Sequence, residues 1–198
     1  MAKTTKPNLW KTKVIHRLQI GESGRGVILN NEGMTEIAAQ LTIQSQIGEI
    51  AIGATDAGVA VVEILVATKK KAFSDSEQAA AHCQAAASQL EEYFAGKRQN
   101  FELALDLVGT EFQKRTWEAI ADLSFGEVAS YRDLAHKAGK PLAARAIGGA
   151  VGANPVPLII GCHRILGSGG KITGYSGGEG LKTKRWLLRH EGIGFRDE

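Results

Sequence analysis

The chain has 198 residues, 43% hydrophobic and 23% charged, with a formal net charge of +3; this is the balance of a soluble globular protein with room for one large or two small domains. No apolar run approaches the roughly 20 residues that span a bilayer, and the basic residues 1–13 lack the apolar core of a secretory signal. The only two cysteines, Cys83 and Cys162, exclude a disulfide framework and a CxxC zinc site. We therefore expect a reducing compartment: the cytoplasm, or the nucleus in a eukaryote.

The first half of the chain predicts a small α/β domain. Residues 1–35 give no clear element beyond two probable turn segments, 21–26 and 30–33. Residues 39–67 alternate and run apolar between glycines, which predicts two or three antiparallel strands. Residues 74–96 predict a helix that opens with a capping box from Ser74 to Glu77 and ends at Gly96. Cys83 lies on its apolar stripe, so we interpret it as a core residue despite its neighbour His82.

An extended connector, residues 100–108, leads to a second, mostly helical domain, so we expect domains at 1–105 and 106–198. Residues 109–123 predict a helix with Thr110 and Gln113 as capping box and Trp117 in the core. Two short helices follow, residues 130–139 and 141–154, the first capped by Ser130 and the second opened by Pro141. Two short helices joined by a glycine-containing turn are the pattern of a helix-turn-helix.

The end of the chain places a cysteine between apolar and glycine-rich segments. Residues 154–160 predict a turn and a short buried strand that delivers Cys162. The glycine-rich stretch 167–180 is either mobile or tightly turned, and residues 181–192 predict a last helix. Cys162 precedes His163 and Arg164, and basic or proton-accepting neighbours are what activate a thiol as a nucleophile.

Positive charge gathers in the same half. Residues 126–190 hold ten Lys or Arg against three acidic residues, a net +7, whereas residues 1–125 and 191–198 each carry −2. This asymmetry predicts a surface that faces a polyanion; a solvated basic face is the alternative. The second short helix carries small residues around one long polar side chain, Arg145, which suits a close approach to a DNA minor groove better than base readout in the major groove. Packing of its small residues against a neighbouring helix is the other interpretation.

Together these motifs resemble the O6-alkylguanine-DNA alkyltransferases. The resemblance rests on "NPVP", Cys-His-Arg, "GYSGG" and "RWLLRHEG", preceded in order by "GTEFQKRTWEAI" and "EVASYRDLAHKAG". It extends from about Phe94 to Gly192 and is weaker over residues 40–66, while residues 1–35 find no counterpart. It implies single-use transfer of an alkyl group from O6-alkylguanine, with O4-alkylthymine as a further substrate, to a cysteine. The base must be flipped out of the duplex because the reacting atom is buried in the base pair.

The resemblance also assigns roles. Cys162 is implied as the alkyl acceptor, His163 as its general base through a water molecule, and Glu191 as the group that orients this histidine. Tyr131 is implied to contact the target nucleotide's phosphate and to donate a proton toward guanine N3, and Asn154 to brace the thiolate and its turn.

Further implied roles concern the DNA. Arg145 replaces the extruded base inside the duplex, and the small residues Ala144 and Gly148 of the same helix belong to the DNA contact. Tyr175 and Ser176 belong to a loop that closes on the base. The implied partner is double-stranded DNA bound through its minor groove by a monomer, with no membrane, cofactor or metal.

The chain departs from the family pattern at two places. Gly161 stands where the family has proline before the cysteine, which puts the rigidity of the site in question. Glu179 and Gly180 read as an insertion near the substrate pocket. The zinc ligands of some members have no equivalents in the first domain.

Two other functions remain open. A lesion-binding DNA protein without chemistry is opposed by the presence of Cys162 with His163. A cysteine hydrolase of unrelated type would not explain the small residues of the helix at 141–154 or the positive charge of residues 126–190.

Overall fold

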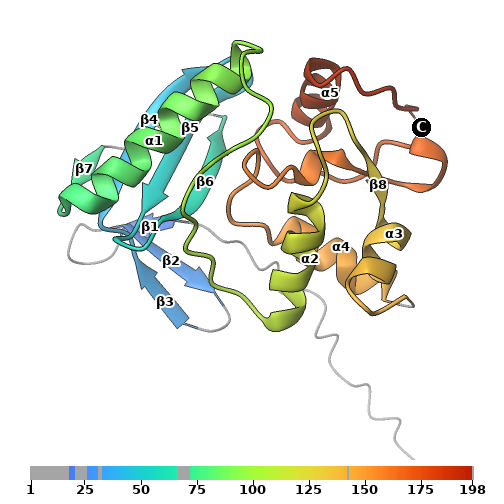
Figure 1. Ribbon diagram of the computed structural model, residues 1–198, viewed down its shortest axis with the longest axis horizontal. Coiled ribbons are helices and arrows are strands. Elements are labelled where there is room, and N and C mark those ends of the chain that lie inside the picture. Colours follow the sequence, from blue (N-terminus) through green and yellow to red (C-terminus); the bar gives the residue numbers. More distant parts are fainter. Residues whose placement is uncertain (1–17, 21–25, 31–32, 67–71, 142, 198) are drawn as a thin grey trace, which may run out of the picture.

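The computed structural model describes residues 18–20, 26–30, 33–66, 72–141 and 143–197. A four-stranded antiparallel sheet lies in the first half, in the order β6-β5-β4-β7. Its strands are β4 Ala39–Ser45, β5 Gly48–Ala54, β6 Val59–Leu65 and β7 Phe73–Ser74. Helix α1, Glu77–Phe94, lies across one face of this sheet (Figure 1). The alternating apolar pattern therefore predicted β4, β5 and β6 correctly, whereas β7 was not predicted.

The start of the helix differs from the sequence prediction. Ser76, not Ser74, caps α1, and its hydroxyl accepts a hydrogen bond from the backbone N–H of Ala79. Ser74 is unavailable as a cap because it ends β7, where it pairs with Ala39. Cys83 is buried in the core as predicted, with 1% of its surface exposed.

Three further strands precede the sheet. They are β1 Leu18–Ile20, β2 Gly26–Asn30 and β3 Gly33–Glu36, which form a separate antiparallel sheet. The sequence pattern did not predict them. Most of the two turn segments expected here, residues 21–25 and 31–32, lies outside the described residues.

The second half is mostly helical. Helix α2 spans Glu111–Ala121, α3 Tyr131–Lys137, α4 Ala144–Gly152 and α5 Leu181–His190. The predicted capping box of Thr110 and Gln113 is present at α2, and Ser130 caps α3 together with Asp133. Helices α3 and α4 pack together beside α2 as the expected helix-turn-helix (Figure 1).

Two boundaries in this half were predicted wrongly. Helix α4 begins at Ala144 rather than at Pro141, because a turn closed by the bond from Ala143 N–H to the Lys140 carbonyl comes first. Residues 154–160 contain an isolated bridge but no strand. Pro155 and Pro157 lack the N–H that a strand ladder requires. The short strand β9, Ile165–Leu166, instead follows the cysteine and pairs with β8, Ala129–Ser130.

One hydrophobic core joins the two halves. It includes Ile50 and Leu90 from the first half and Trp117, Leu158 and Leu187 from the second. Backbone bonds add to this core: Val62 of β6 donates to the Pro155 carbonyl at 2.9 Å, and Val59 donates to Ala104 at 2.9 Å. Gly58 is needed at this second contact, because a Cβ there would lie 2.6 Å from the Ala104 oxygen. The region around Cys162 is therefore supported from both halves.

Trp117 locks α2 against α4, which predicts an effect of its replacement on stability. Its side chain is 1% exposed, and its Nε1–H donates to the Ala150 carbonyl at 2.9 Å. Trp117→Phe should lower the free energy of unfolding by about 1–3 kcal/mol, through a lost hydrogen bond and a cavity. Urea denaturation measures the loss. Trp186→Phe is the control at a half-buried tryptophan, and an equal loss there would contradict the locking role.

Candidate active site

Cys162 begins a short 3-10 helix, η2 Cys162–Arg164, at the end of the proline-containing turn. Its side chain lies in the core with 7% of the residue exposed. Burial raises the pKa of the thiol, while Asn154, Lys184 and Tyr175 act in the opposite direction. The resting sulfur is therefore a protonated thiol, and a base must accept its proton as it reacts.

The turn before the cysteine is held tightly. Asn154 donates from its side-chain amide to the Ile160 carbonyl at 2.8 Å and accepts from Val156 N–H at 3.1 Å. Leu158 adopts a positive φ of 79°, which is rare for a bulky side chain and marks local strain. Cys162 N–H bonds to the Ile160 carbonyl at 2.7 Å. Asn154 thus links the end of α4 to the segment that carries the thiol.

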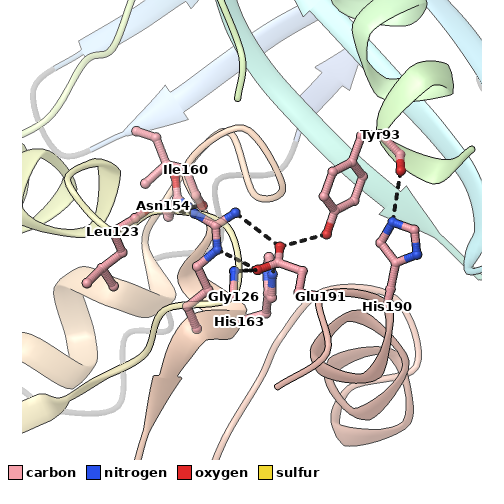
Figure 2. A network of polar contacts seen from close by, with 9 residues as sticks. Tyr93, Leu123, Gly126, Asn154, Ile160, His163, His190 and Glu191 are labelled. Atoms are coloured by element: carbon pink, nitrogen blue, oxygen red, sulfur yellow. Dashed lines mark hydrogen bonds and ion pairs between the residues drawn. The ribbon is translucent and has the colours of Figure 1, made fainter. Parts of the chain in front are cut away.

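His163, the residue after Cys162, forms a buried pair with Glu191 (Figure 2). His163 Nε2 lies 2.7 Å from Glu191 Oε1, and both side chains are fully buried. An ionised carboxylate only accepts hydrogen bonds, so Nε2 must carry the proton and donate it, which leaves Nδ1 with a free lone pair. Nδ1 has no hydrogen-bond partner among the described residues. The geometry gives His163 the tautomer of a general base, without a direct bond to Cys162.

Glu191 is the most heavily bonded side chain of the site. Its Oε2 accepts from Arg164 Nε at 2.8 Å and from Gly126 N–H at 3.2 Å, and its Oε1 accepts from Arg164 Nη2 at 3.1 Å and from the Tyr93 hydroxyl at 2.8 Å. Burial alone would raise the pKa of Glu191, but the bonds from His163 and Arg164 outweigh it and hold this pKa far below its usual range. The carboxylate is thus ionised at neutral pH.

The imidazole of His163 stays neutral at rest. Burial lowers its pKa, and the nearby Arg164 and Lys184 add to that effect, whereas Glu191 opposes it. Burial is the largest of these influences. A neutral imidazole can accept a proton, and the adjacent carboxylate stabilises the imidazolium that results.

Lys184 is a buried cation that the sequence did not reveal. It is 0% exposed, and its Nζ donates to the carbonyls of Ile165 at 2.5 Å and Thr173 at 2.9 Å. Burial lowers its pKa to about 8, while the interaction with Cys162 raises it. A positive charge here favours a thiolate over a thiol.

The residues predicted to contact DNA lie on α3, α4 and the glycine-rich loop. Tyr131 starts α3, and its ring faces Gly148 of α4, where an added Cβ would lie 4.0 Å from the ring. Arg145 is exposed, and no described side chain pairs with it. Ala144 is the first residue of α4. The interpretation of α4 as a packing helix holds for its buried face, Ile147, Ala150 and Val151, whereas Arg145 shares an exposed face with Ala146, Gly149 and Gly152.

The glycine-rich loop is tightly turned and packs on the first half. Tyr175 is half-buried and its hydroxyl lies beside the thiol, whose pKa it lowers, while Ser176 is exposed. Gly178 has a φ of 52°, and an added Cβ would lie 2.9 Å from Ile64 of β6. Glu179 forms an ion pair with Lys182 at 2.7 Å, and Gly180 caps α5. The loop therefore closes over the cysteine from the side of the sheet.

Gly161 adopts a backbone angle that proline also adopts. Its φ is −68°, so the departure from the family residue leaves this angle unchanged. An added Cβ would lie 2.9 Å from Arg164 Nε, and Arg164 is anchored by Glu191 and by the Leu123 carbonyl at 2.7 Å. A side chain at position 161 would therefore have to displace Arg164.

Sequence reasoning missed three members of the site: Tyr93, Arg164 as a partner of Glu191, and Lys184. Arg164 had a signal, because it follows the Cys-His pair directly. Tyr93 and Lys184 had none, since the first lies on a helix that faces the core and the second is one of four Lys or Arg residues in a basic helix. Within the described ranges, no group of three or more His, Cys, Asp or Glu is arranged to hold a metal, and no helix is long and apolar enough to cross a bilayer.

Both halves of the chain match domain models of one protein family. Residues 40–107 match the family described as "6-O-methylguanine DNA methyltransferase, ribonuclease-like domain", and residues 111–193 match "6-O-methylguanine DNA methyltransferase, DNA binding domain". A methylated-DNA–protein-cysteine methyltransferase of Methanosarcina barkeri is 40% identical over 150 residues, 75% of this chain and 94% of that protein. One of Mycobacterium tuberculosis is 48% identical over 106 residues, 54% of this chain and 63% of that protein. The crystal structure of M. tuberculosis OGT in complex with DNA superposes with a TM-score of 0.66 at 39% identity, over 76% of this chain and 90% of that one.

The depressed pKa of Glu191 predicts how stability depends on pH. A carboxylate whose pKa is lower in the folded than in the unfolded protein stabilises the fold at pH values above its unfolded-state pKa, about 4.3. It loses that contribution as the pH falls toward its folded-state pKa. The free energy of unfolding should therefore fall more steeply below about pH 4 in the wild type than in Glu191→Gln. Denaturation at a series of pH values checks this. Glu92→Gln, at a surface ion pair, is the control and should follow the wild-type slope.

Proposed function

The chain belongs to the O6-methylguanine-DNA methyltransferase family, and we propose that it repairs DNA by moving the alkyl group of O6-alkylguanine onto its own Cys162. Its enzyme class is methylated-DNA–protein-cysteine methyltransferase, which acts once per chain. The observation that supports Cys162 as acceptor is the buried His163–Glu191 pair, 2.7 Å apart, at the residue that follows Cys162 in the chain.

The chemical step balances with the groups present. His163 Nδ1 takes the thiol proton through a bridging water, and the sulfur attacks the alkyl carbon. A carbon–sulfur bond forms as the bond from that carbon to guanine O6 breaks, and its electron pair stays with the guanine. The base is then neutralised by a proton, for which Tyr131 is the proposed donor toward N3. Glu191 stabilises the imidazolium throughout.

Access to the base requires that it leave the duplex. We propose that the exposed, bare face of α4 enters the minor groove, with Ala144 and Gly148 allowing close approach and Arg145 filling the position of the flipped base. The net +7 of residues 126–190 supplies phosphate contacts. Tyr175 and Ser176 close on the base, and Asn154 holds the thiol in a fixed position relative to α4.

The remaining predictions complete this proposal. The chain acts as a monomer with its DNA-contacting and acceptor residues in 106–198, in the cytoplasm or the nucleus, and O4-alkylthymine is a second substrate. A non-catalytic lesion-binding protein is the alternative. Cys162 argues against it, because a protein that only binds lesions needs no thiol next to a proton-accepting histidine.

Stoichiometry tests the function. Excess methylated duplex mixed with a known amount of protein should transfer one methyl group per chain, since nothing in the sequence indicates a means to cleave a thioether. The adduct should lie on the peptide that holds Cys162. Cys162→Ser should abolish transfer, because a hydroxyl is far less nucleophilic at neutral pH.

Cys83→Ser is the matched control and should retain transfer. Cys83 bonds to the Ala39 and Ile52 carbonyls, and burial raises its pKa to about 11. Turnover beyond one methyl per chain would refute the single-use mechanism, and no transfer at all would favour the lesion-binding alternative.

Arg145→Ala should slow repair of duplex DNA far more than reaction with free O6-benzylguanine. Base flipping costs a few kcal/mol, so loss of the group that holds the duplex open should slow duplex repair by about tenfold or more. Single-turnover rates on both substrates measure the difference. Arg98→Ala, which removes a cation paired with Glu92 far from α4, should change neither rate. Equal losses on both substrates would remove the proposed role of Arg145.

A further inference from the structure

Tyr93 brings a hydrogen bond from the first half of the chain into the active site. It lies in the last turn of α1, 98 residues before Glu191, and is fully buried. Its hydroxyl donates to Glu191 Oε1 at 2.8 Å, the same oxygen that faces His163 Nε2 at 2.7 Å (Figure 2). Three donors therefore share one carboxylate oxygen: Tyr93 from the N-terminal helix, the proposed base His163, and Arg164, whose Nη2 lies 3.1 Å away.

The ring of Tyr93 is surrounded by other aromatic rings. It packs edge-on to Phe94, Phe125 and His190, with ring centroids 5.4, 6.2 and 4.8 Å away. His190 Nε2 also lies 2.8 Å from the Tyr93 backbone carbonyl. His190 immediately precedes Glu191, so α1 contacts the end of α5 through both the backbone and the side chain of one residue.

Other groups act on the Glu191 carboxylate or on the residues next to it. Arg164 of η2 bonds to both oxygens of Glu191, Gly126 N–H bonds to Oε2, and Lys184 of α5 acts on His163 and Cys162. Burial, with Glu191 beside it, raises the pKa of Tyr93 well above its ordinary value, so the hydroxyl stays protonated and donates. Tyr93 is thus an uncharged hydrogen-bond donor to the ionised Glu191.

We propose that Tyr93 is a positioning residue for alkyl transfer: its hydroxyl holds the Glu191 carboxylate and limits how strongly that carboxylate attracts the proton of His163. This inference rests on the proposed roles of His163 and Glu191. A hydrogen bond to a carboxylate reduces the negative charge available to its other partner. Without Tyr93, Oε1 would attract the imidazole proton more strongly, and the pKa of His163 would rise.

The consequence for the reaction has a defined sign. His163 must be neutral to accept the thiol proton, so the transfer rate rises with pH through the pKa of this histidine. A higher pKa moves the acid limb of the pH–rate profile to higher pH. Tyr93→Phe should therefore shift that limb to higher pH and slow transfer by about two- to tenfold at pH values on the limb, the worth of one hydrogen bond. Affinity for DNA should not change, because Tyr93 is buried beneath the site.

The experiment compares Tyr93→Phe with Thr116→Val. Thr116 is also a fully buried hydroxyl, which donates to the Phe112 carbonyl at 2.8 Å within α2. Single-turnover methyl transfer is followed across the pH range in which the histidine titrates, and the imidazole of His163 is titrated by NMR in the free protein. We expect both readouts to move in Tyr93→Phe and neither to move in Thr116→Val.

Two outcomes would overturn the inference: an unchanged His163 titration in folded Tyr93→Phe, or the same shift in Thr116→Val. If Tyr93→Phe does not fold, 3-fluorotyrosine at position 93 provides the test. Its more acidic hydroxyl is a stronger donor and must move the acid limb to lower pH; no movement refutes the proposal. A wild type that transfers no methyl group would refute the proposed function, while the NMR titration would still decide the role of Tyr93.

Discussion

The site depends on keeping one carboxylate ionised inside the protein. Burying a lone charge costs several kcal/mol, and an ion pair recovers that cost only when its remaining hydrogen-bonding positions are filled. Glu191 meets this condition through a two-nitrogen contact with Arg164 and single bonds from His163, Tyr93 and Gly126. Every partner is needed, because the loss of one leaves a buried charge incompletely satisfied.

This requirement explains why the active site draws on the whole chain. The donors come from the end of α1, the loop after α2, and η2, whereas the carboxylate follows α5. The chain can satisfy Glu191 only after the sheet half and the helical half have packed into their common core. The bond from Val62 to Pro155 and the contact of Gly178 with Ile64 extend the same dependence to the turn and the loop on either side of Cys162. The sheet half, which lacks the proposed nucleophile Cys162, thus helps to build the candidate site.

Local signals in the sequence were reliable where neighbours in the chain decide the structure. The capping residues Thr110 and Ser130 and the buried Cys83 were predicted correctly, since each depends on spacing within one helix. Ser74 failed because pairing with Ala39 competes with capping, and the strand expected before Cys162 failed because of Pro155 and Pro157. In the site, Cys162 and His163 stood out by adjacency, whereas Glu191 needed a family resemblance. Tyr93 and Lys184 could not be predicted, because only tertiary packing brings Tyr93 to Glu191 and Lys184 close to Cys162.

Burial also sets the resting state of the reacting groups. It raises the pKa of Cys162 and lowers that of His163, so the thiol and the imidazole both rest uncharged. The charges that would favour a proton transfer between them, Glu191 and Lys184, are already in place and fixed by hydrogen bonds. Such preorganised charges need no rearrangement as the reaction proceeds. In the proposed mechanism the Cys162 thiol reacts only once, so side reactions would waste the protein. A neutral thiol is less reactive than a thiolate, and it stays so until the substrate lies next to Cys162, His163 and Lys184.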